Sequence, residues 1–469
     1  MSLPRAVLGN GRTVMVLSDR GRIVWGALPD TGVSPAFEAI AGGEFVLEPL
    51  DDCTVSRHYI GETSVLQTLY ESPTGKASVL DFLPIRRGLT NTVMNTPHAR
   101  LVRVVEGHAG QMRFGLRFAP HVDGAPAGLE LDANGLVCRG RTRSLLLQTE
   151  AAVDLSAHEA HGDFVLGAGE KRHFVLTALD DPDPDVPEMR ATEPDWDLDG
   201  TLDYWIAWAQ GCPFQGAQRQ HVLKLASVLK AVWLPLRDVP ARLAQELYAS
   251  PYTLLAPLAL AAWGWEEELQ LMLGRDLPDP GSARDRLRAA WLLANLFEAQ
   301  ATGLVEGTLL LPVWPTLLPM AEAIAANRRE ADSESVRLAY WAALNAASAL
   351  CEELLLPGDA GHFANAAHAL GETLQDAGAA SLPRGLAQIE TGAAARVWDV
   401  RRELAVGGYL QARRLMDQLL QDHDVLGMLP GQHAPDAGVL ALALWTAAEI
   451  YLQAAPRPAR VELPGELGD

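Results

Sequence analysis

The sequence contains few cysteines, and they are far apart. The 469-residue chain has Cys53, Cys138, Cys212 and Cys351. None of them forms a CxxC pair, so no zinc-binding pattern is present. Scattered cysteines favour reduced thiols over a disulfide framework, and no apolar stretch typical of a secretion signal follows Met1. These absences predict a cytoplasmic protein without disulfides or a structural metal.

Positive charge is also scarce. Lys and Arg number 38 against 59 Asp and Glu, which gives a formal net charge of −21. Nucleic acids and anionic membranes attract basic surfaces, so neither is expected as a partner. No uncharged apolar run reaches the roughly 18 residues of a membrane span; the nearest stretch, 309–324, is interrupted by three prolines. Nothing in the sequence predicts an oligomeric state.

The usual cofactor motifs are missing as well. Gly9-Asn10-Gly11 is not followed by a helical pattern, so it is not a dinucleotide fingerprint. The chain has no HExxH pair and no serine nucleophile elbow. The alternating acids from Asp181 to Asp185 are separated by prolines, which indicates a solvated segment rather than a calcium loop. The sequence therefore predicts no cofactor and no metal.

The hydrophobic pattern divides the chain into two halves. Up to about residue 180, short apolar runs alternate with turn residues, as in half-buried antiparallel strands. These runs predict a β-sandwich domain over 1–180. The predicted strands are 13–17, 23–25, 44–47, 64–70, 77–82, 101–106, 112–118, 144–149 and 172–176.

An acidic, proline-rich segment over 181–200 is predicted to be an extended linker, because proline disfavours helix and like charges repel. From residue 201 the apolar spacing becomes helical, and a helical domain is predicted over 201–455, followed by a tail over 456–469. The predicted helices are 201–211, 215–233, 238–249, 252–263, 265–273, 282–300, 316–328, 333–354, 361–376, 391–404, 408–420 and 437–453.

Several segments resemble a known family in the expected order. Leu8-Gly9-Asn10-Gly11 opens the chain, Asp81-Phe82-Leu83-Pro84 lies within the β half, and Tyr204-Trp205 begins the helical half. Together they resemble glycoside hydrolase family 15, the bacterial glucoamylase-like and trehalase-like proteins. The resemblance implies an α+β protein of two domains, an antiparallel β-sandwich followed by an (α/α)6 toroid of the six-hairpin glycosidase type. It also implies a carbohydrate ligand, an α-glucoside. Trp205 and Trp208, three residues apart, are expected to be core residues of a helix rather than sugar platforms.

The family hydrolyses glycosides with two glutamates, a protonated general acid and an ionised general base that activates water. An Arg–Asp pair grips the glucose. Here the helix end around Trp265 aligns with the family, but gapless counting places Ser250 and Pro251 where the grip should be. Arg237-Asp238 has the letters of the grip but lies upstream. Arg237, Asp238 and Trp265 are therefore the substrate-binding candidates from this segment.

Neither catalytic glutamate has a match. Ala325 stands at the acid position, and the nearest carboxylates are Glu322 and Glu330. Glu330 follows two arginines, which favour the ionised form that a general acid does not use. Gly431 stands at the base position, followed by Gln432 and His433, which could hold a water molecule.

Three hypotheses remain open. The first is a degenerate family member, a pseudoenzyme that binds a carbohydrate or a protein partner without hydrolysis. The second is an active α-glucosidase or trehalase-like hydrolase with carboxylates from unexpected positions. The third is an interaction protein whose toroid mouth is filled by apolar side chains. Candidates for the unexpected carboxylates are Glu246, Glu306, Glu322, Glu330 and Glu390.

Overall fold

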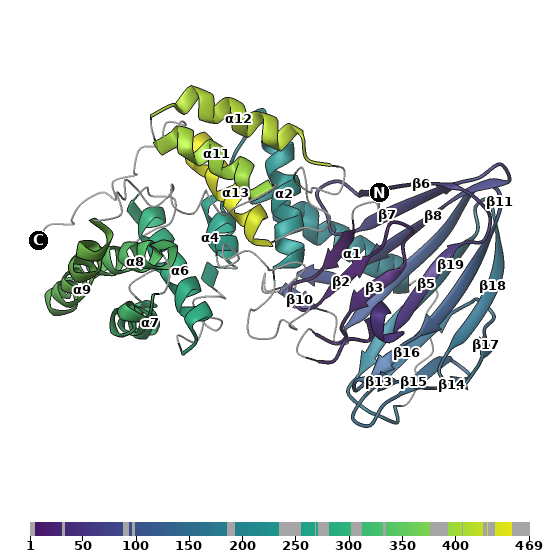
Figure 1. Ribbon diagram of the computed structural model, residues 1–469. Coiled ribbons are helices and arrows are strands. Elements are labelled where there is room, and N and C mark those ends of the chain that lie inside the picture. Colours follow the sequence, from purple (N-terminus) through teal and green to yellow (C-terminus); the bar gives the residue numbers. More distant parts are fainter. Residues whose placement is uncertain are drawn as a thin grey trace, which may run out of the picture.

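The computed structural model has a β half followed by a helical half (Figure 1). Strands end at Leu179 and the first helix begins at Glu193, which confirms the predicted order of an antiparallel β region and then helices. No helix in the described part of the chain is both long enough and apolar enough to cross a bilayer. The described residues are 5–30, 33–87, 93–95, 99–184, 193–233, 255–267, 269–270, 281–301, 312–331, 334–375, 393–405, 407–424, 429 and 437–452.

Fifteen strands form two antiparallel sheets that share strand β11 (Arg100–Ala119). The first sheet also contains β1 (Ala6–Gly9), β2 (Val14–Leu17), β3 (Ile23–Gly26), β4 (Phe37–Glu38), β5 (Glu44–Pro49), β17 (Asp154–Leu155) and β18 (Ala160–Gly167). The second sheet also contains β6 (Thr54–Tyr59), β7 (Leu66–Glu71), β8 (Gly75–Phe82), β14 (Gly128–Asp132), β15 (Gly135–Arg139), β16 (Ser144–Thr149) and β19 (Lys171–Leu179). Short pieces outside these sheets are η1 (Ala39–Ala41), β9 (Ile85–Arg87), β10 (Val93–Asn95), β12 (His121–Val122) and β13 (Ala125–Pro126).

Strand β11 corrects the prediction of two separate strands over 101–106 and 112–118. Its first half pairs with β8 and β19, and its second half with β5 and β18. The change occurs where the pairing with β8 shifts register between Gly107 and Ala109, and Gly110 has a φ of 61°. Glycine allows such irregular backbone without ending the strand. The residues that resembled a turn in the sequence are therefore a bend between two sheets.

The two sheets pack face to face across an aromatic core. Tyr70 of the second sheet meets Phe114 of the first at a ring-centroid distance of 5.9 Å. Phe164 and Phe174, also from opposite sheets, are 5.7 Å apart. Offset and tilted aromatic pairs at such distances stabilise a core beyond the area they bury. The contacts fix the two sheets as facing layers.

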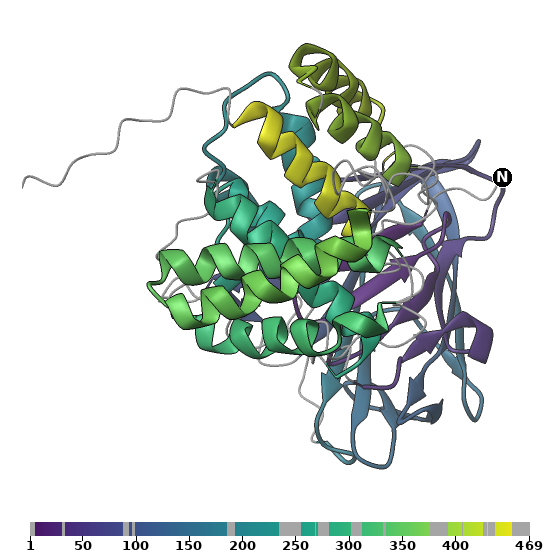
Figure 2. The same cartoon turned by 60° about the vertical axis from the view of Figure 1, so that its left-hand side comes forward.

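The helical half is built from antiparallel neighbours. Helices α8 and α9 pack along each other, as do α11 and α12 (Figure 2). The last helix, α13, is buried over nearly its whole circumference and contacts α2, α4 and α11, as expected for a central helix. The bounds are α1 (Glu193–Gln210), α2 (Arg219–Val232), α4 (Leu255–Ala262), α6 (Ala283–Ala301), α7 (Trp314–Ala326), η5 (Arg328–Glu330), α8 (Glu334–Glu353), α9 (Pro357–Gln375), α11 (Ala393–Ala405), α12 (Tyr409–Gln421) and α13 (Ala437–Tyr451).

Helix α1 begins earlier than predicted. The linker was expected to be extended to residue 200, but residues from Glu193 onward are helical. Pro194 is the second helical residue, where its missing N–H is tolerated, and Glu193 and Asp195 lie in the first turn, where the helix dipole favours negative charge. The same acids and proline that suggested an extended linker therefore begin a helix.

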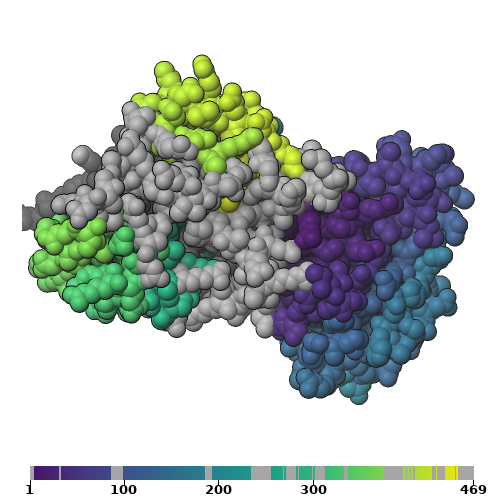
Figure 3. All heavy atoms as spheres, in the orientation of Figure 1, coloured from purple at the N-terminus to yellow at the C-terminus, as the bar shows by residue number. Residues whose placement is uncertain are grey.

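The two halves share one hydrophobic core. Residues of both belong to a single continuous cluster of buried side chains. Helix α1 also covers the outer face of the second sheet, where Leu198 and Leu202 pack against Val102 and Val104. The space-filling view in Figure 3 shows the β half as one continuous body beside the helices.

Candidate functional site

Two of the predicted acids lie on the helical half, near the end of α7. Glu322 is exposed on α7, and Glu330 ends the short helix η5. The Glu330 carboxylate lies 3.0 Å from the Arg286 guanidinium of α6 and remains 66% exposed, whereas the Arg286 side chain is 9% exposed. An ion pair of this kind uses the charged carboxylate, whereas a general acid must carry a proton. The described geometry of Glu330 is that of a surface partner for a buried cation.

The position where gapless counting predicted the general acid is part of the interior. Ala325 lies in the last turn of α7 and is 3% exposed. Its neighbours Ala321 and Ile324 are also buried. A carboxylate at this position would enter an apolar core rather than a wet cleft.

Trp265 is held by Trp208. The two indoles stack at 4.1 Å with an interplanar angle of 8°, and the Trp265 Nε1 donates to the Trp208 carbonyl at 2.7 Å. Trp265 is 5% exposed, and Trp205 and Trp208 are 1% and 3% exposed. The burial of Trp205 and Trp208 confirms them as core residues. Trp265 is held in the same way. One face of its ring is covered by Trp208, and its only hydrogen-bond donor is bonded within the protein.

The other predicted site residues fall outside the described residues. They are Glu246, Glu306, Glu390, Arg237, Asp238, Gln432 and His433. Their assignments remain predictions. Among the described residues, no group of three or more His, Cys, Asp or Glu side chains could hold a metal ion.

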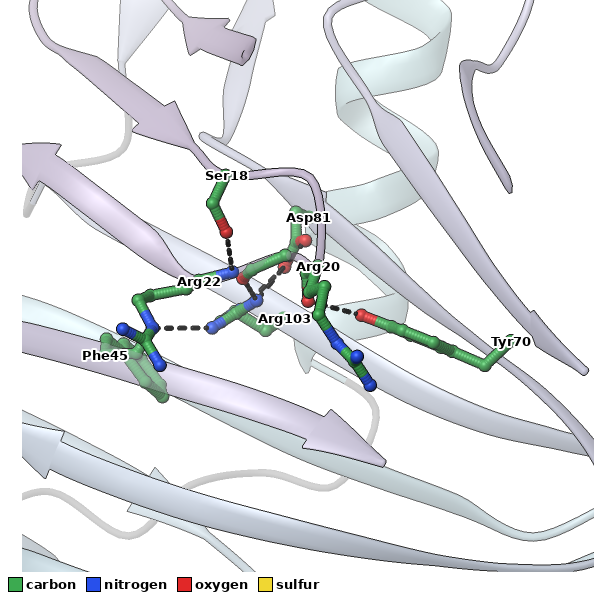
Figure 4. Close-up of polar contacts among 8 residues, drawn as sticks. Ser18, Arg20, Arg22, Phe45, Tyr70, Asp81 and Arg103 are labelled. Carbon is green, nitrogen blue, oxygen red and sulfur yellow. Dashed lines mark hydrogen bonds and ion pairs between the residues drawn. The ribbon is translucent and has the colours of Figure 1, made fainter. Parts of the chain in front are cut away.

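A buried polar centre lies inside the β-sandwich (Figure 4). Arg103 and Asp81 are both fully buried, and the Arg103 Nε donates to the Asp81 carboxylate at 2.7 Å. Burial raises the pKa of Asp81, while the Arg103 charge opposes this rise. Arg103 also donates to the carbonyl of Gly21, and the Tyr70 hydroxyl donates to that of Arg20 at 2.8 Å. The centre fixes the β2–β3 turn, so its chemistry is structural.

A second polar network joins α2 to the last helices. The Asp417 carboxylate of α12 accepts from Gln218 at 2.9 Å and from the Tyr451 hydroxyl at 2.6 Å. Burial raises the pKa of Tyr451, and the Asp417 charge raises it further. The phenol therefore remains a hydrogen-bond donor at neutral pH.

The same helix face carries a histidine pair that the sequence did not reveal. His221 Nδ1 of α2 and His423 Nε2, two residues after α12, are 3.1 Å apart, although 202 residues separate them in the chain. The His423 Nδ1 lies 2.9 Å from the Asp424 carbonyl. Burial lowers the pKa of His221, and the neighbouring His423 lowers it further. Scattered histidines without a local motif gave no signal that these two would meet.

Lys224 lies one turn further along α2, against the β half. Its Nζ donates to the Gly61 carbonyl at 3.2 Å and lies 4.6 Å above the centre of the Tyr59 ring. Burial lowers the pKa of Lys224 to about 8, against the opposing charges of Glu62 and Asp424. The junction of the two halves thus contains a lysine that is partly uncharged near neutral pH.

A cavity of about 430 Å³ opens at the β14–β15 hairpin, far along the chain from the predicted acids. Its polar lining includes Asp132, Asn134, Gln148 and Thr149. The Gln148 amide already donates to the Asn134 carbonyl, and Asp132 accepts from the Asn134 N–H. With one carboxylate among its described lining residues, the cavity does not provide the acid pair that glycoside hydrolysis needs.

Comparisons with known proteins give partial similarity. No protein-family model matches the chain. A trehalase of Thermoplasma volcanium is 24% identical over 245 residues, which covers 48% of this chain and 36% of that protein. Trehalase 1 of Sulfolobus acidocaldarius is 36% identical over 86 residues, covering 18% of this chain and 15% of that protein. The similarity thus spans about a third or less of the length of these curated relatives.

A solved structure described as a kojibiose phosphorylase from human microbiome covers 77% of this chain and 67% of its own, with 8% identity and a TM-score of 0.34. At that TM-score the alignment carries no argument about this protein. The sequence similarity to trehalases therefore stands as the main external finding.

Proposed function

We propose that the protein is a trehalase-like relative of glycoside hydrolase family 15 that binds an α-glucoside and has lost efficient hydrolysis. The similarity to two trehalases supports the carbohydrate class. The order of an antiparallel β half and a helical half is the order that this family implies. Fold alone does not determine function, so the proposal depends on the state of the site.

We further propose that the helical half is an (α/α)6 toroid. Helices α2, α4, α6 and α8 contact one another in chain order. Helix α13 contacts both α2 and α4, so the last described helix packs against the first helices of the series. This return to the beginning of the series is the arrangement expected of a ring of helices.

The loss of hydrolysis is carried by one observation, the buried alanine at the acid position. Ala325 is 3% exposed within α7, so the family's proton donor has no counterpart there. Of the nearby carboxylates, Glu330 is paired with Arg286. Removing a catalytic carboxylate normally lowers turnover by orders of magnitude.

The test is glucose release from trehalose, maltose, isomaltose and starch, measured with a coupled glucose assay. The purified chain should release no more glucose than a blank without protein, and turnover above that blank would overturn the proposal. Binding is measured in parallel as the shift in melting temperature with each sugar, because a ligand that binds the folded state raises it. Turnover that E330Q or E322Q abolishes would overturn the proposal. Absence of both turnover and binding would also overturn it and favour the interaction protein.

The similarity to trehalases also favours the active hydrolase as a second candidate. In that case the parent chain hydrolyses trehalose, and the separate variants E246Q, E306Q, E322Q, E330Q and E390Q identify the carboxylates, since losing either member of a catalytic pair abolishes most of the activity.

A further inference from the structure

Helix α12 is attached to α2 at two points. Near its middle, Asp417 accepts a hydrogen bond from Gln218. Just beyond its last residue, His423 meets His221 at 3.1 Å. In Figure 1 α12 lies beside α11 along the outside of the helical half. Between these points, Asp422 also lies 3.9 Å from Arg396 of α11 in an exposed ion pair. The histidine pair is thus the attachment that holds this end of α12 on α2.

The direction of each hydrogen bond follows from its partners. The Asp424 carbonyl can only accept, so His423 Nδ1, at 2.9 Å, must carry a proton. In neutral His423 the other nitrogen, Nε2, is then an acceptor. His221 Nδ1 must therefore donate to it. In the neutral pair, His221 Nε2 is left as the basic nitrogen.

Proton uptake affects this pair in two different steps. After a first proton is bound, one N–H still lies between the two rings. The hydrogen bond therefore persists, and the positive charge strengthens it. A second proton places an N–H on both facing nitrogens. The rings then have two donors and no acceptor at 3.1 Å, and they carry like charges.

The charged groups at the junction that contains the pair come from both halves of the protein. From α2 the neighbouring cation is Lys224, and the acid that follows His423 is Asp424. The β half contributes the acid Glu62, the base Arg57 and the phenol Tyr59 to the same junction. The helical half also contributes Asp417 of α12, which is hydrogen-bonded to Tyr451 of α13. Burial and His423 are the influences that lower the pKa of His221.

We infer that His221 and His423 form an acid-labile latch, which holds the end of α12 on α2 with no proton or one proton added and opens when both rings are charged. The direction in which pH acts on the latch follows from the linkage between proton binding and opening. The closed pair holds one added proton, whereas two separated histidines hold two, so the open form binds more protons and is favoured as the pH falls below about 6.5, the value of an unperturbed histidine. The latch is therefore closed at neutral pH and opens in mild acid.

The test is hydrogen–deuterium exchange of the full chain at pH 7.5 and pH 5.5, corrected for the intrinsic exchange rate. Protection of peptides from Tyr409–Gln421 is divided by that of peptides from Glu334–Glu353, which contain no histidine. This ratio should fall by up to about tenfold in the parent chain, since one further proton changes an equilibrium by at most tenfold per pH unit and pH 5.5 lies about one unit below the value of an unperturbed histidine. No fall in the ratio would overturn the inference.

The deciding variant is His423→Gln. A glutamine amide can accept from His221 and donate to the Asp424 carbonyl, and it does not titrate. The exchange ratio should then be the same at both pH values. An equal fall in the variant and the parent would show that other groups are responsible and would overturn the inference. Should that variant fold poorly, His221→Gln gives the same test from the other helix.

The matched control is His368→Gln. His368 is on α9, its side chain is 79% exposed, and it pairs with Glu372 on the same helix. This variant should retain the acid-induced fall of the parent chain. Loss of the fall in His368→Gln would overturn the inference. The readout does not use sugar turnover, so the result is independent of the proposed function.

Discussion

Gly9 of β1 and Ala231 of α2 bring the β half and the helical half into main-chain contact. A β-carbon on Gly9 would lie 1.6 Å from the Ala231 carbonyl oxygen. The obstacle is backbone, so no side-chain rotation can relieve it. The Gly9 N–H also donates to Ser64 at 3.0 Å, which fixes the strand from the other side. Gly9 is therefore required for close packing of the two halves.

Gly9→Ala is expected to destabilise the protein by about 3 kcal/mol, near the upper end for overpacking, because β1 or α2 must move. The measurement is urea unfolding followed by circular dichroism. Gly361→Ala is the control, since nothing lies within 4 Å of a β-carbon there. It lies within α9, where alanine should be neutral or stabilising by up to about 1 kcal/mol. Equal effects of the two variants would contradict the close contact.

The buried ion pair gives a second stability prediction. Arg103→Met leaves Asp81 as a lone buried charge, and Asp81→Leu does the same to Arg103, so each should cost about 3–5 kcal/mol. The double variant should cost less than the sum of the two, because neither charge is left behind. Urea unfolding of the four proteins forms a double-mutant cycle. If the losses in unfolding free energy of the two single variants add up to the loss of the double variant, the two residues are not coupled, which would contradict the pairing.

The control for the buried Arg103–Asp81 pair is Arg139→Met, which removes an ion pair at the surface. The Arg139 side chain is 33% exposed and pairs with Glu130 at 2.8 Å and with Asp183. Exposed ion pairs are screened by solvent and contribute little, so this variant should change the unfolding free energy little. A loss as large as that of Arg103→Met would show that burial does not determine the cost.

Much of the fold was predictable from hydrophobic spacing. The predicted helices over 316–328, 333–354 and 408–420 correspond to α7, α8 and α12 within a few residues. Strands β6 and β18 were not predicted, and two other regions were misread for a shared reason. Glycine in β11 and proline in the first turn of α1 normally end elements, yet tertiary pairing and helix position allow both. The local sequence does not show whether such a glycine or proline ends a helix or strand or lies within one.

The site was less predictable than the fold. The mismatch at Ala325 was visible in the sequence, and the structure adds that this alanine is buried. The Glu330–Arg286 pair joins residues 44 positions apart, and the His221–His423 pair joins residues 202 positions apart. Such contacts depend on how helices are arranged in space. No local motif encodes them.

Lys224 should react with amine reagents at lower pH than an ordinary lysine. Its pKa is lowered to about 8, mainly by burial, whereas an unperturbed lysine has a value near 10.4. The chain has only four lysines, Lys76, Lys171, Lys224 and Lys230, so each can be followed by mass spectrometry after acetylation. The rate at Lys224 should rise with a midpoint near pH 8. A rate still rising at pH 10 would contradict the shift.

The same shift predicts how Lys224→Met affects stability. The folded pKa is lowered, so the lysine contributes fully above about pH 10.4 and less as the pH falls through about 8. Removing the charge should therefore stabilise the protein at pH 7 and have little effect near pH 10. The gain should be about 1 kcal/mol or less, since the ammonium also gives up its contacts with Gly61 and Tyr59. Melting temperatures at the two pH values measure it.

Trp265→Phe separates a packing role from sugar binding. Phenylalanine can still stack on Trp208 but cannot donate to its carbonyl, which keeps its hydrogen bond from the Gly211 N–H, so the cost should be about 0.5–1.5 kcal/mol. Trp196→Phe is the matched control, because Trp196 is 60% exposed on α1 and its replacement should stay within about 0.5 kcal/mol. For any α-glucoside that raises the melting temperature of the parent chain, Trp265→Phe should lower the starting temperature and preserve the shift. Loss of the shift with unchanged stability would instead assign the indole to the ligand, since a platform acts only when sugar is bound.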